Sequence, residues 1–131
     1  MKGKKLKEYI PTEYEEQKIV IKFLNILKQQ RKVVEFHSVP NENLLSNLNR
    51  QKAAAVQQIL KANGAKSGVP DLFVYLKDKL LIIEMKRRKR GRLSENQKYW
   101  LGVLEGLNYI KTFVAYGAEE AINFIQKEIN G

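Results

Sequence analysis

The segment KSGVPDLFVYLKDKLLIIEMK, residues 66–86, decides the fold of this 131-residue chain. After a turn that ends at a proline, it predicts two strands, Asp71–Leu76 and Leu80–Lys86, joined by a short polar turn. Side chains alternate between the two faces of a strand, so Glu84 and Lys86 fall on the same face. An otherwise apolar strand therefore ends with a carboxylate and an ammonium side by side. Such a pair costs desolvation energy unless something binds it.

The length of the turn between the two strands decides whether Asp71 joins this pair. An even turn, Asp78-Lys79 or residues 77–80, places Asp71 opposite Lys86 and on the same face as Glu84. A three-residue turn would send Asp71 to the other face unless a bulge restored the phase. We therefore expect an even turn or a compensating bulge, with three charged side chains converging at one end of the hairpin.

The residues before the hairpin predict two helices and one strand. Residues 1–11 are basic, and we expect a flexible lead-in. Thr12, with Glu15 three positions later, has the pattern of a capping box, and Gly64 stands where a helix would end. The expected elements are a helix over Glu13–Arg31, a strand over Val33–Ser38, a loop over residues 41–49 and a helix over Arg50–Asn63.

The residues after the hairpin predict two more helices and one strand. A basic run, residues 86–92, leads to Ser94, which caps the next helix, and Gly106 stops it. Trp100 and Leu101 on this helix are expected in the core and not as base-stacking residues. The expected elements are a helix from Ser94 to Glu105, a strand over Tyr109–Tyr116 and a helix over Ala118–Ile129. The order α-β-α-β-β-α-β-α, without a repeat or a linker, predicts one α/β domain over residues 12–131.

Composition narrows the chemistry. The chain has no cysteine and a single histidine, His37, which excludes disulfides, thiol catalysis and His-rich metal sites. A metal would be held by carboxylates and carbonyls, which favour hard ions such as Mg²⁺, Mn²⁺ or Ca²⁺. Two carboxylates at the hairpin end can hold Mg²⁺ while the adjacent lysine orients or deprotonates a water. Phosphodiester hydrolysis needs these parts.

Charge and hydropathy indicate the partner and the compartment. The net charge of +10 points to a polyanion, nucleic acid before an anionic membrane surface. No apolar run reaches the roughly 18 residues of a membrane-spanning helix, and the start of the chain lacks the apolar stretch of a secretory signal. We expect an intracellular protein that is not secreted.

Several motifs resemble one nuclease superfamily. The pattern Gly68-Val69-Pro70-Asp71, twelve intervening residues, then Glu84-Met85-Lys86 is similar to the PD-(D/E)xK motif. The segments that resemble its VRR-NUC branch are Leu93-Ser94-Glu95-Asn96-Gln97, Thr12-Glu13-Tyr14-Glu15-Glu16-Gln17 and His37-Ser38-Val39-Pro40-Asn41-Glu42. The resemblance spans about residues 12–126. It is typical of stand-alone phage or bacterial members, which implies the cytoplasm of a bacterial or phage-infected cell.

The resemblance implies a fold, an activity and a set of roles. The fold is α/β, with a restriction-endonuclease-like αβββαβ core and a mixed central sheet flanked by helices. The activity is Mg²⁺- or Mn²⁺-dependent cleavage of branched DNA such as four-way (Holliday) junctions, by a homodimer. Asp71, Glu84 and the Met85 carbonyl would bind the metal, and Lys86 would attend the water. Gln97 and Glu13 would complete the site.

Some of these roles have structural alternatives. Glu84 and Lys86 could be a charge pair that protects a sheet edge, and Ser94-x-x-Gln97 is also a capping box. Glu13, Glu15 and Glu16 all lie in a first helical turn, where acids are favoured by the helix dipole. We favour Glu13, because it lies one turn from Gln17 on one helix face.

The sequence leaves open whether the polyanion is only bound or also cleaved, and whether it is DNA or RNA. The residues expected to contact DNA phosphates are Lys66, Arg87, Arg88, Lys89, Arg90 and Arg92. A DNA-binding module without catalysis would share this charge, although it would gain nothing from acids facing phosphate. A nuclease acting on RNA is the other alternative, because the metal chemistry is indifferent to the sugar.

Overall fold

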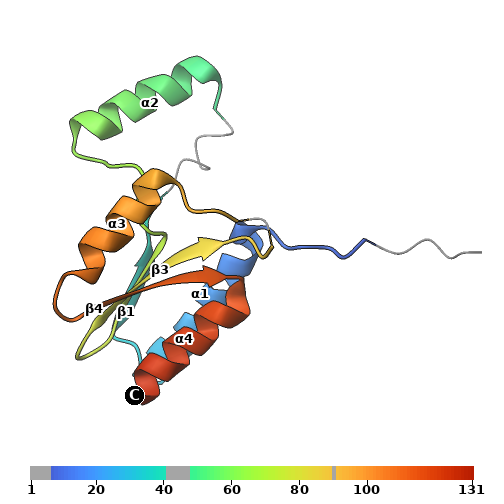
Figure 1. Ribbon diagram of the computed structural model, residues 1–131, viewed down its shortest axis with the longest axis vertical. Helices are drawn as coiled ribbons and strands as arrows, with labels where there is room; N and C mark the ends of the chain where they lie inside the picture. The colour runs from blue at the N-terminus through green and yellow to red at the C-terminus, as the bar shows by residue number, and fades with distance from the viewer. Residues whose placement is uncertain (1–6, 41–47, 90) are drawn as a thin grey trace, which may run out of the picture.

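The computed structural model describes residues 7–40, 48–89 and 91–131, which form four helices and a four-stranded sheet (Figure 1). In chain order they are α1 (Glu13–Gln29), β1 (Glu35–Ser38), α2 (Arg50–Ala62), β2 (Leu72–Tyr75), β3 (Leu80–Lys86), α3 (Glu95–Glu105), β4 (Ile110–Tyr116) and α4 (Ala118–Asn130). The predicted order is confirmed. The sheet runs β1-β2-β3-β4, antiparallel except for the parallel pair β3 and β4. This is the expected mixed sheet, with α2 inserted between the first two strands of an αβββαβ core.

The main core lies between one face of the sheet and the helices α1 and α4. The buried side chains of β3 on this face alternate, as the strand pattern predicts. They pack against an apolar stripe of α1 and a second stripe of α4. The core residues are Val20, Leu24, Leu27, Val33, Leu72, Val74, Leu81, Ile83, Met85, Ala115, Ala118, Ala121 and Ile125. Because this face is covered by apolar residues, the charged end of β3 points to the opposite face, where α3 lies.

The helix α2 stands apart from the sheet, above the N-terminal end of α3 (Figure 1). None of its residues is buried, and Ile59 is 62% exposed. Its ends are fixed locally: the Asn49 side chain accepts a hydrogen bond from the Lys52 amide, and Gly64 takes the left-handed conformation just after it. Capping and alanine-rich composition therefore form this helix without help from the core.

The β2–β3 turn has the expected even length, but its register differs from the prediction by two residues. The Leu76 amide donates to the Lys79 carbonyl, so Lys77 and Asp78 form the tip. Phe73 pairs with Ile82. Extending this register places Asp71 opposite Glu84 and not opposite Lys86. In the observed register Leu76 packs against the core, and the Lys79 ammonium lies 3.0 Å from Glu128 on α4.

Most element boundaries agree with the prediction to within two residues. The helix α1 ends at Gln29 instead of Arg31, because Arg31 adopts a positive φ of 61° and turns the chain. The strand β1 starts at Glu35, and Val33 before it is buried in the core. The loop expected over residues 41–49 lies mostly outside the described residues. No described helix combines the length and hydropathy that crossing a lipid bilayer requires.

The buried carboxylate of Glu128 joins α4 to the segment before β3 and to β4. Its loss should destabilise the fold. It lies 3.0 Å from the Lys79 ammonium and 3.2 Å from that of Lys111. Burial raises the pKa of Glu128, but the hydrogen bonds from these two lysines outweigh it and lower the pKa below 4.5. Glu128→Gln should cost about 1–2 kcal/mol at pH 7. Because the folded-state pKa of Glu128 is lowered, the difference in stability between the variant and wild type should shrink as the pH falls below 4.5. Urea unfolding of both proteins at pH 7 and below pH 4.5 would measure it.

Candidate active site

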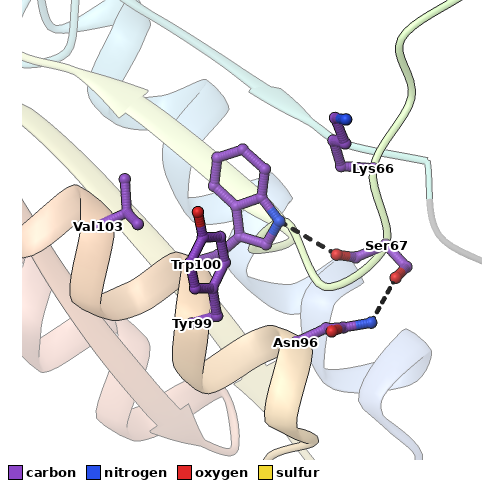
Figure 2. Close-up of a pocket in the computed structure, with 6 residues that line it drawn as sticks. All are labelled: Lys66, Ser67, Asn96, Tyr99, Trp100 and Val103. Atoms are coloured by element: carbon purple, nitrogen blue, oxygen red, sulfur yellow. Dashed lines mark hydrogen bonds between the residues drawn. The ribbon is translucent and has the colours of Figure 1, made fainter.

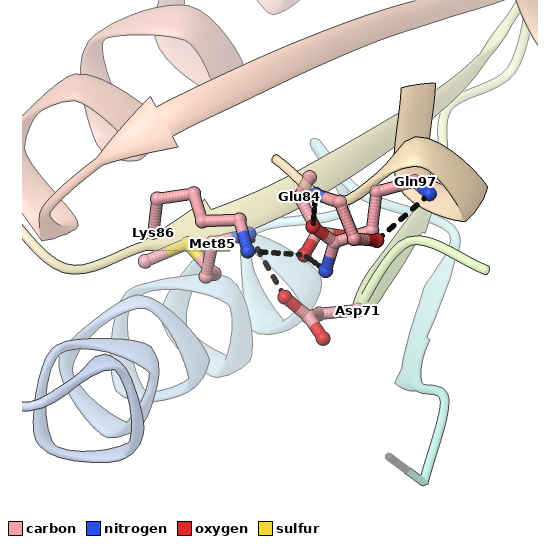
Figure 3. A network of polar contacts seen from close by, with 6 residues as sticks. Asp71, Glu84, Met85, Lys86 and Gln97 are labelled. Carbon is pink, nitrogen blue, oxygen red and sulfur yellow. Dashed lines mark hydrogen bonds and ion pairs between the residues drawn. The ribbon is translucent and has the colours of Figure 1, made fainter. Parts of the chain in front are cut away.

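The predicted site residues meet in a cleft beside the carboxyl end of β3, which we call the site cleft. Its volume is about 720 Å³. Residues from α1, β1 and α2, from the segment before β2, from β3 and from α3 form its walls. They are Glu13, Val39, Pro40, Gln57, Leu60, Lys61, Ala65, Lys66, Ser67, Gly68, Val69, Asp71, Glu84, Lys86, Arg92, Ser94, Asn96 and Gln97. The hairpin and the first turn of α3 bring the polar groups together (Figure 3).

Asp71 is placed by the Gly-Val-Pro segment before it. Gly68 has a φ of 86°, which favours glycine, and Pro70 is fully buried. The Asp71 carbonyl accepts a hydrogen bond from Val39 at the end of β1, which anchors the backbone. Its side-chain Oδ2 accepts a hydrogen bond of 2.9 Å from the Met85 amide. The carboxylate is therefore held beside β3, just beyond the last residue pair of the hairpin.

Glu84 is almost fully buried, with an exposed fraction of 2%. Its Oε1 accepts a 2.9 Å hydrogen bond from Gln97 and lies 3.8 Å from the Lys86 ammonium. Its Oε2 is buried and has no hydrogen-bond partner. Burial and the charge of Asp71 raise the pKa of Glu84 to about 8, although Lys86 opposes the shift. Two carboxylates thus lie close together, and one oxygen of Glu84 is buried without a hydrogen-bond donor.

The backbone of Met85 contributes to the same edge of the site. In a strand, the N–H and C=O of one residue point to the same side, and the next residue points to the other. The Met85 amide points to Asp71, and the Lys86 carbonyl accepts a hydrogen bond from Gly117 beyond β4. The Met85 carbonyl therefore faces Asp71, which is the orientation that the metal-ligand prediction needs.

Gln97 joins α3 to β3. The side chain of Ser94 accepts a hydrogen bond from the Gln97 amide, and the Gln97 side chain accepts one from the Ser94 amide, which is a complete capping box. The same Gln97 side chain donates through Nε2 to Glu84. The oxygen of the Gln97 amide caps the helix, and its nitrogen orients a buried carboxylate. The position of Gln97 is therefore compatible both with a helix cap and with a role in the site.

Two cap variants separate these two roles. Gln97→Ala and Ser94→Ala each remove part of the capping box, and each should cost about 1 kcal/mol of stability. Gln97→Ala also removes the hydrogen bond that Gln97 donates to Glu84, so the rate of the cleavage that the sequence predicts should fall about 10- to 100-fold. Ser94→Ala should lower the rate much less. Equal rate losses in single-turnover assays would show that Gln97 acts only as a helix cap.

The three acids of the first turn of α1 have different surroundings. Glu13 lines the site cleft, and its charge adds to the upward pKa shift of Glu84. Glu15 accepts hydrogen bonds from Tyr9 and Thr12, and Glu16 pairs with Arg88 at 3.4 Å. Glu13 is therefore the one of the three that lies at the cleft, which favours it for the predicted role.

The predicted DNA-binding residues fall into two groups. Lys66 and Arg92 line the site cleft. The basic run after β3 instead contacts the N-terminal part of the chain: Arg87 donates to the Ile10 carbonyl, Arg88 pairs with Glu16, and Lys89 pairs with Glu8. These contacts hold the basic run against the N-terminal part of the chain. Arg90 lies outside the described residues, and phosphate contact by this group stays a prediction.

Some residues at the site were not singled out from the sequence. Gln57, Leu60 and Lys61 reach the site cleft from α2, whose position no local pattern encodes. Ser67 accepts a 2.7 Å hydrogen bond from Asn96. Trp100, expected in the core, is only partly buried and donates to the Ser67 carbonyl at 3.1 Å, so that expectation was wrong. The sequence signal for this part of the site was a second aromatic residue, Tyr99, directly before Trp100. Tyr99 is exposed in the structure.

The donor set fits a hard divalent cation. Glu84 offers a buried oxygen without a partner, Asp71 a second carboxylate, and Met85 a carbonyl that faces it. Carboxylate and carbonyl oxygens are what Mg²⁺ prefers, and it keeps several waters. Among residues 7–40, 48–89 and 91–131, no three His, Cys, Asp or Glu side chains are grouped so that they could hold an ion. An ion here would therefore rely on two side chains, one carbonyl and water.

Comparison with known proteins supports the same family. The VRR-NUC domain model matches residues 6–119, which is most of the chain. A solved structure described as "VRR_NUC domain protein" has a TM-score of 0.62 and 22% sequence identity, over 93% of this chain and 91% of that chain. This likeness shows a common fold, and no curated protein matches the sequence. From the family match and the shared fold together, we conclude that this chain belongs to the VRR-NUC family of nuclease-type domains.

Proposed function

We propose that this protein is a metal-dependent endonuclease that hydrolyses DNA phosphodiester bonds in the site cleft. The observation that carries this proposal is the buried Oε2 of Glu84, which has no hydrogen-bond partner and lies beside a second carboxylate. A buried carboxylate oxygen without a hydrogen-bond partner is costly for a protein that only binds DNA. A divalent cation held by Asp71 and Glu84 would provide a partner for this oxygen.

In this proposal each residue has one role. Asp71, Glu84 and the Met85 carbonyl hold Mg²⁺ or Mn²⁺, and Gln97 fixes the Glu84 carboxylate through its 2.9 Å hydrogen bond. When bound there, the ion would supply polarisation of the scissile phosphate and would offset its developing negative charge. Lys86, buried beside Glu84 as an ammonium, orients the attacking water, and the proton of that water passes to solvent. No small-molecule cofactor and no membrane take part in this proposal.

The cleft also carries positive charge for the substrate. Lys61, Lys66 and Arg92 line its rim, and the chain has a net charge of +10. These cations supply the sequence-independent attraction to phosphates, which weakens steeply with salt. We propose branched DNA, such as a four-way junction, as the preferred substrate. This preference follows the resemblance of the motifs to stand-alone members of the family.

Cleavage of a set of matched substrates tests the proposed function. Labelled four-way junction, flap, single-stranded and linear duplex DNA, with an RNA duplex of the same sequence, would be incubated with the protein and Mg²⁺. We expect faster cleavage of the branched DNA than of the linear duplex. Binding without cleavage of any substrate in Mg²⁺ or Mn²⁺ would favour the inactive DNA-binding module, and preferred cleavage of RNA would favour the RNA nuclease.

Paired incisions in a junction require two active sites, and one chain provides one. We therefore expect the protein to sediment as a homodimer, with a mass twice the 15.2 kDa of the chain. Analytical ultracentrifugation with and without a four-way junction would measure this mass. A monomer that makes two incisions per junction only by sequential binding would refute the dimer while leaving the hydrolytic site intact.

A further inference from the structure

A second hollow opens beside the site cleft, on the exposed side of α3. Its volume is about 360 Å³ (Figure 2). We call it the aromatic pocket; it is lined by Lys66, Ser67, Asn96, Tyr99, Trp100 and Val103. Lys66, Ser67 and Asn96 also line the site cleft, so the two hollows share a wall. A strand whose phosphates enter the cleft therefore lies next to the aromatic pocket.

The Trp100 indole of the pocket is held by a hydrogen bond before any ligand arrives, and the Tyr99 ring lies edge-on to it. The Trp100 Nε1 donates to the Ser67 carbonyl at 3.1 Å, and Asn96 donates to the Ser67 hydroxyl at 2.7 Å. The Tyr99 ring lies 6.1 Å from the indole at 78°, and Tyr99 is 67% exposed (Figure 2). An aromatic side chain that is already ordered loses little conformational entropy when a ligand binds to it.

We propose that the aromatic pocket binds an unpaired nucleobase of the strand whose phosphates occupy the site cleft; this inference rests on the proposed function. Every base has an aromatic face, and stacking of bases on protein aromatic residues is common in single-strand binding. Lys66 at the shared wall provides a cation for the adjoining phosphate. A base within a duplex is covered on both faces by its neighbours, so the pocket would favour DNA with unstacked nucleotides.

The single tryptophan of the chain makes this proposal measurable without catalysis. The protein would be titrated in EDTA, which removes divalent metal, with a short single-stranded thymidine oligonucleotide while Trp100 fluorescence is followed. An abasic oligonucleotide of the same length provides the same phosphates without bases. We expect saturable quenching by the thymidine oligonucleotide and little or none by the abasic one.

Two pairs of variants sharpen the test. Tyr99→Ala should weaken binding of the thymidine oligonucleotide about 5- to 100-fold, and Tyr99→Phe, which keeps the ring, should bind nearly as wild type. The matched control is Tyr109→Ala, because Tyr109 is 79% exposed and precedes β4 at the opposite end of the sheet. It should not change the affinity.

Equal quenching by the two oligonucleotides, or wild-type affinity of Tyr99→Ala, would overturn the proposal. A change in sedimented mass of Tyr99→Ala without a change in oligonucleotide affinity would assign the pocket to a second copy of the chain and also overturn it. The proposed function fails separately. Quenching without cleavage of any substrate in Mg²⁺ or Mn²⁺ would refute the nuclease and keep the pocket, and cleavage without quenching would do the reverse.

Discussion

Glu84→Gln should abolish cleavage and, at the same time, stabilise the protein in the absence of metal. Glutamine keeps an oxygen for the hydrogen bond from Gln97 and removes the buried charge that Asp71 repels. Loss of a group that merely supports a metal ligand costs about 10- to 100-fold, so loss of the ligand itself should cost about 1,000-fold or more. Single-turnover cleavage of a labelled junction in Mg²⁺ would measure the rate.

The stability gain should depend on pH in a defined direction. The folded-state pKa of Glu84 is raised from 4.5 to about 8, so the contribution of Glu84 to wild-type stability is most favourable below pH 4.5 and is lost as the pH rises through 8. In EDTA at pH 8, Glu84→Gln should be about 1–3 kcal/mol more stable than wild type, and at pH 4 the two should be nearly equal. Chemical denaturation at both pH values would measure this difference.

A matched carboxylate serves as the control for both measurements. Glu95 lies in the first turn of α3, two residues before Gln97, and its side chain is exposed. Glu95→Gln should keep the cleavage rate and lack the pH-dependent gain in stability. If Glu84→Gln cleaved as fast as wild type, Glu84 would not be a ligand. If it were less stable than wild type at pH 8, the buried carboxylate would be satisfied within the protein.

Gly68→Ala should destabilise the protein severely and lower cleavage with it. Gly68 has a φ of 86°, and a Cβ there would lie 2.6 Å from the backbone carbon of Asn96. The added methyl would push away the first turn of α3, which carries Gln97. Conformational strain of about 1 kcal/mol and overpacking of about 1–3 kcal/mol together predict a loss of about 2–4 kcal/mol. Thermal unfolding would measure it.

Gly64 offers a control with the same backbone strain and no clash. Its φ is 94°, and a Cβ there would meet nothing within 4 Å. Gly64→Ala should therefore cost only about 1 kcal/mol and leave α3 in place. Similar losses for the two variants would mean that strain alone explains Gly68, and that close packing of α3 on the Gly-Val-Pro segment does not position the site.

Much of this fold could be predicted from local sequence. The alternation along Leu80–Lys86 placed Glu84 and Lys86 on one face, and the strand has these bounds in the structure. Caps at Thr12 and Ser94 marked the starts of α1 and α3. These features depend on neighbouring residues and on hydrogen bonds within one turn, so the sequence expresses them directly.

Features that depend on tertiary packing could not be predicted in the same way. The even length of the turn predicted the face of Asp71, but it did not distinguish two registers that differ by two residues. The observed register includes long-range contacts, among them that of Lys79 with Glu128 on α4. The partial exposure of Trp100 follows from the Ser67 carbonyl that holds its indole, which lies 33 positions earlier. Contacts between residues far apart in the chain carry no local pattern.

The most direct test of the central claim is metal-dependent cleavage by the wild-type protein on one labelled four-way junction. Parallel reactions would contain Mg²⁺, Mn²⁺ or EDTA, with protein in excess over the junction, and products would be resolved on a denaturing gel. Carboxylate ligands at Asp71 and Glu84 predict cleavage with either ion and none in EDTA. Equal cleavage in EDTA, or binding without cleavage in both metals, would contradict the proposed site.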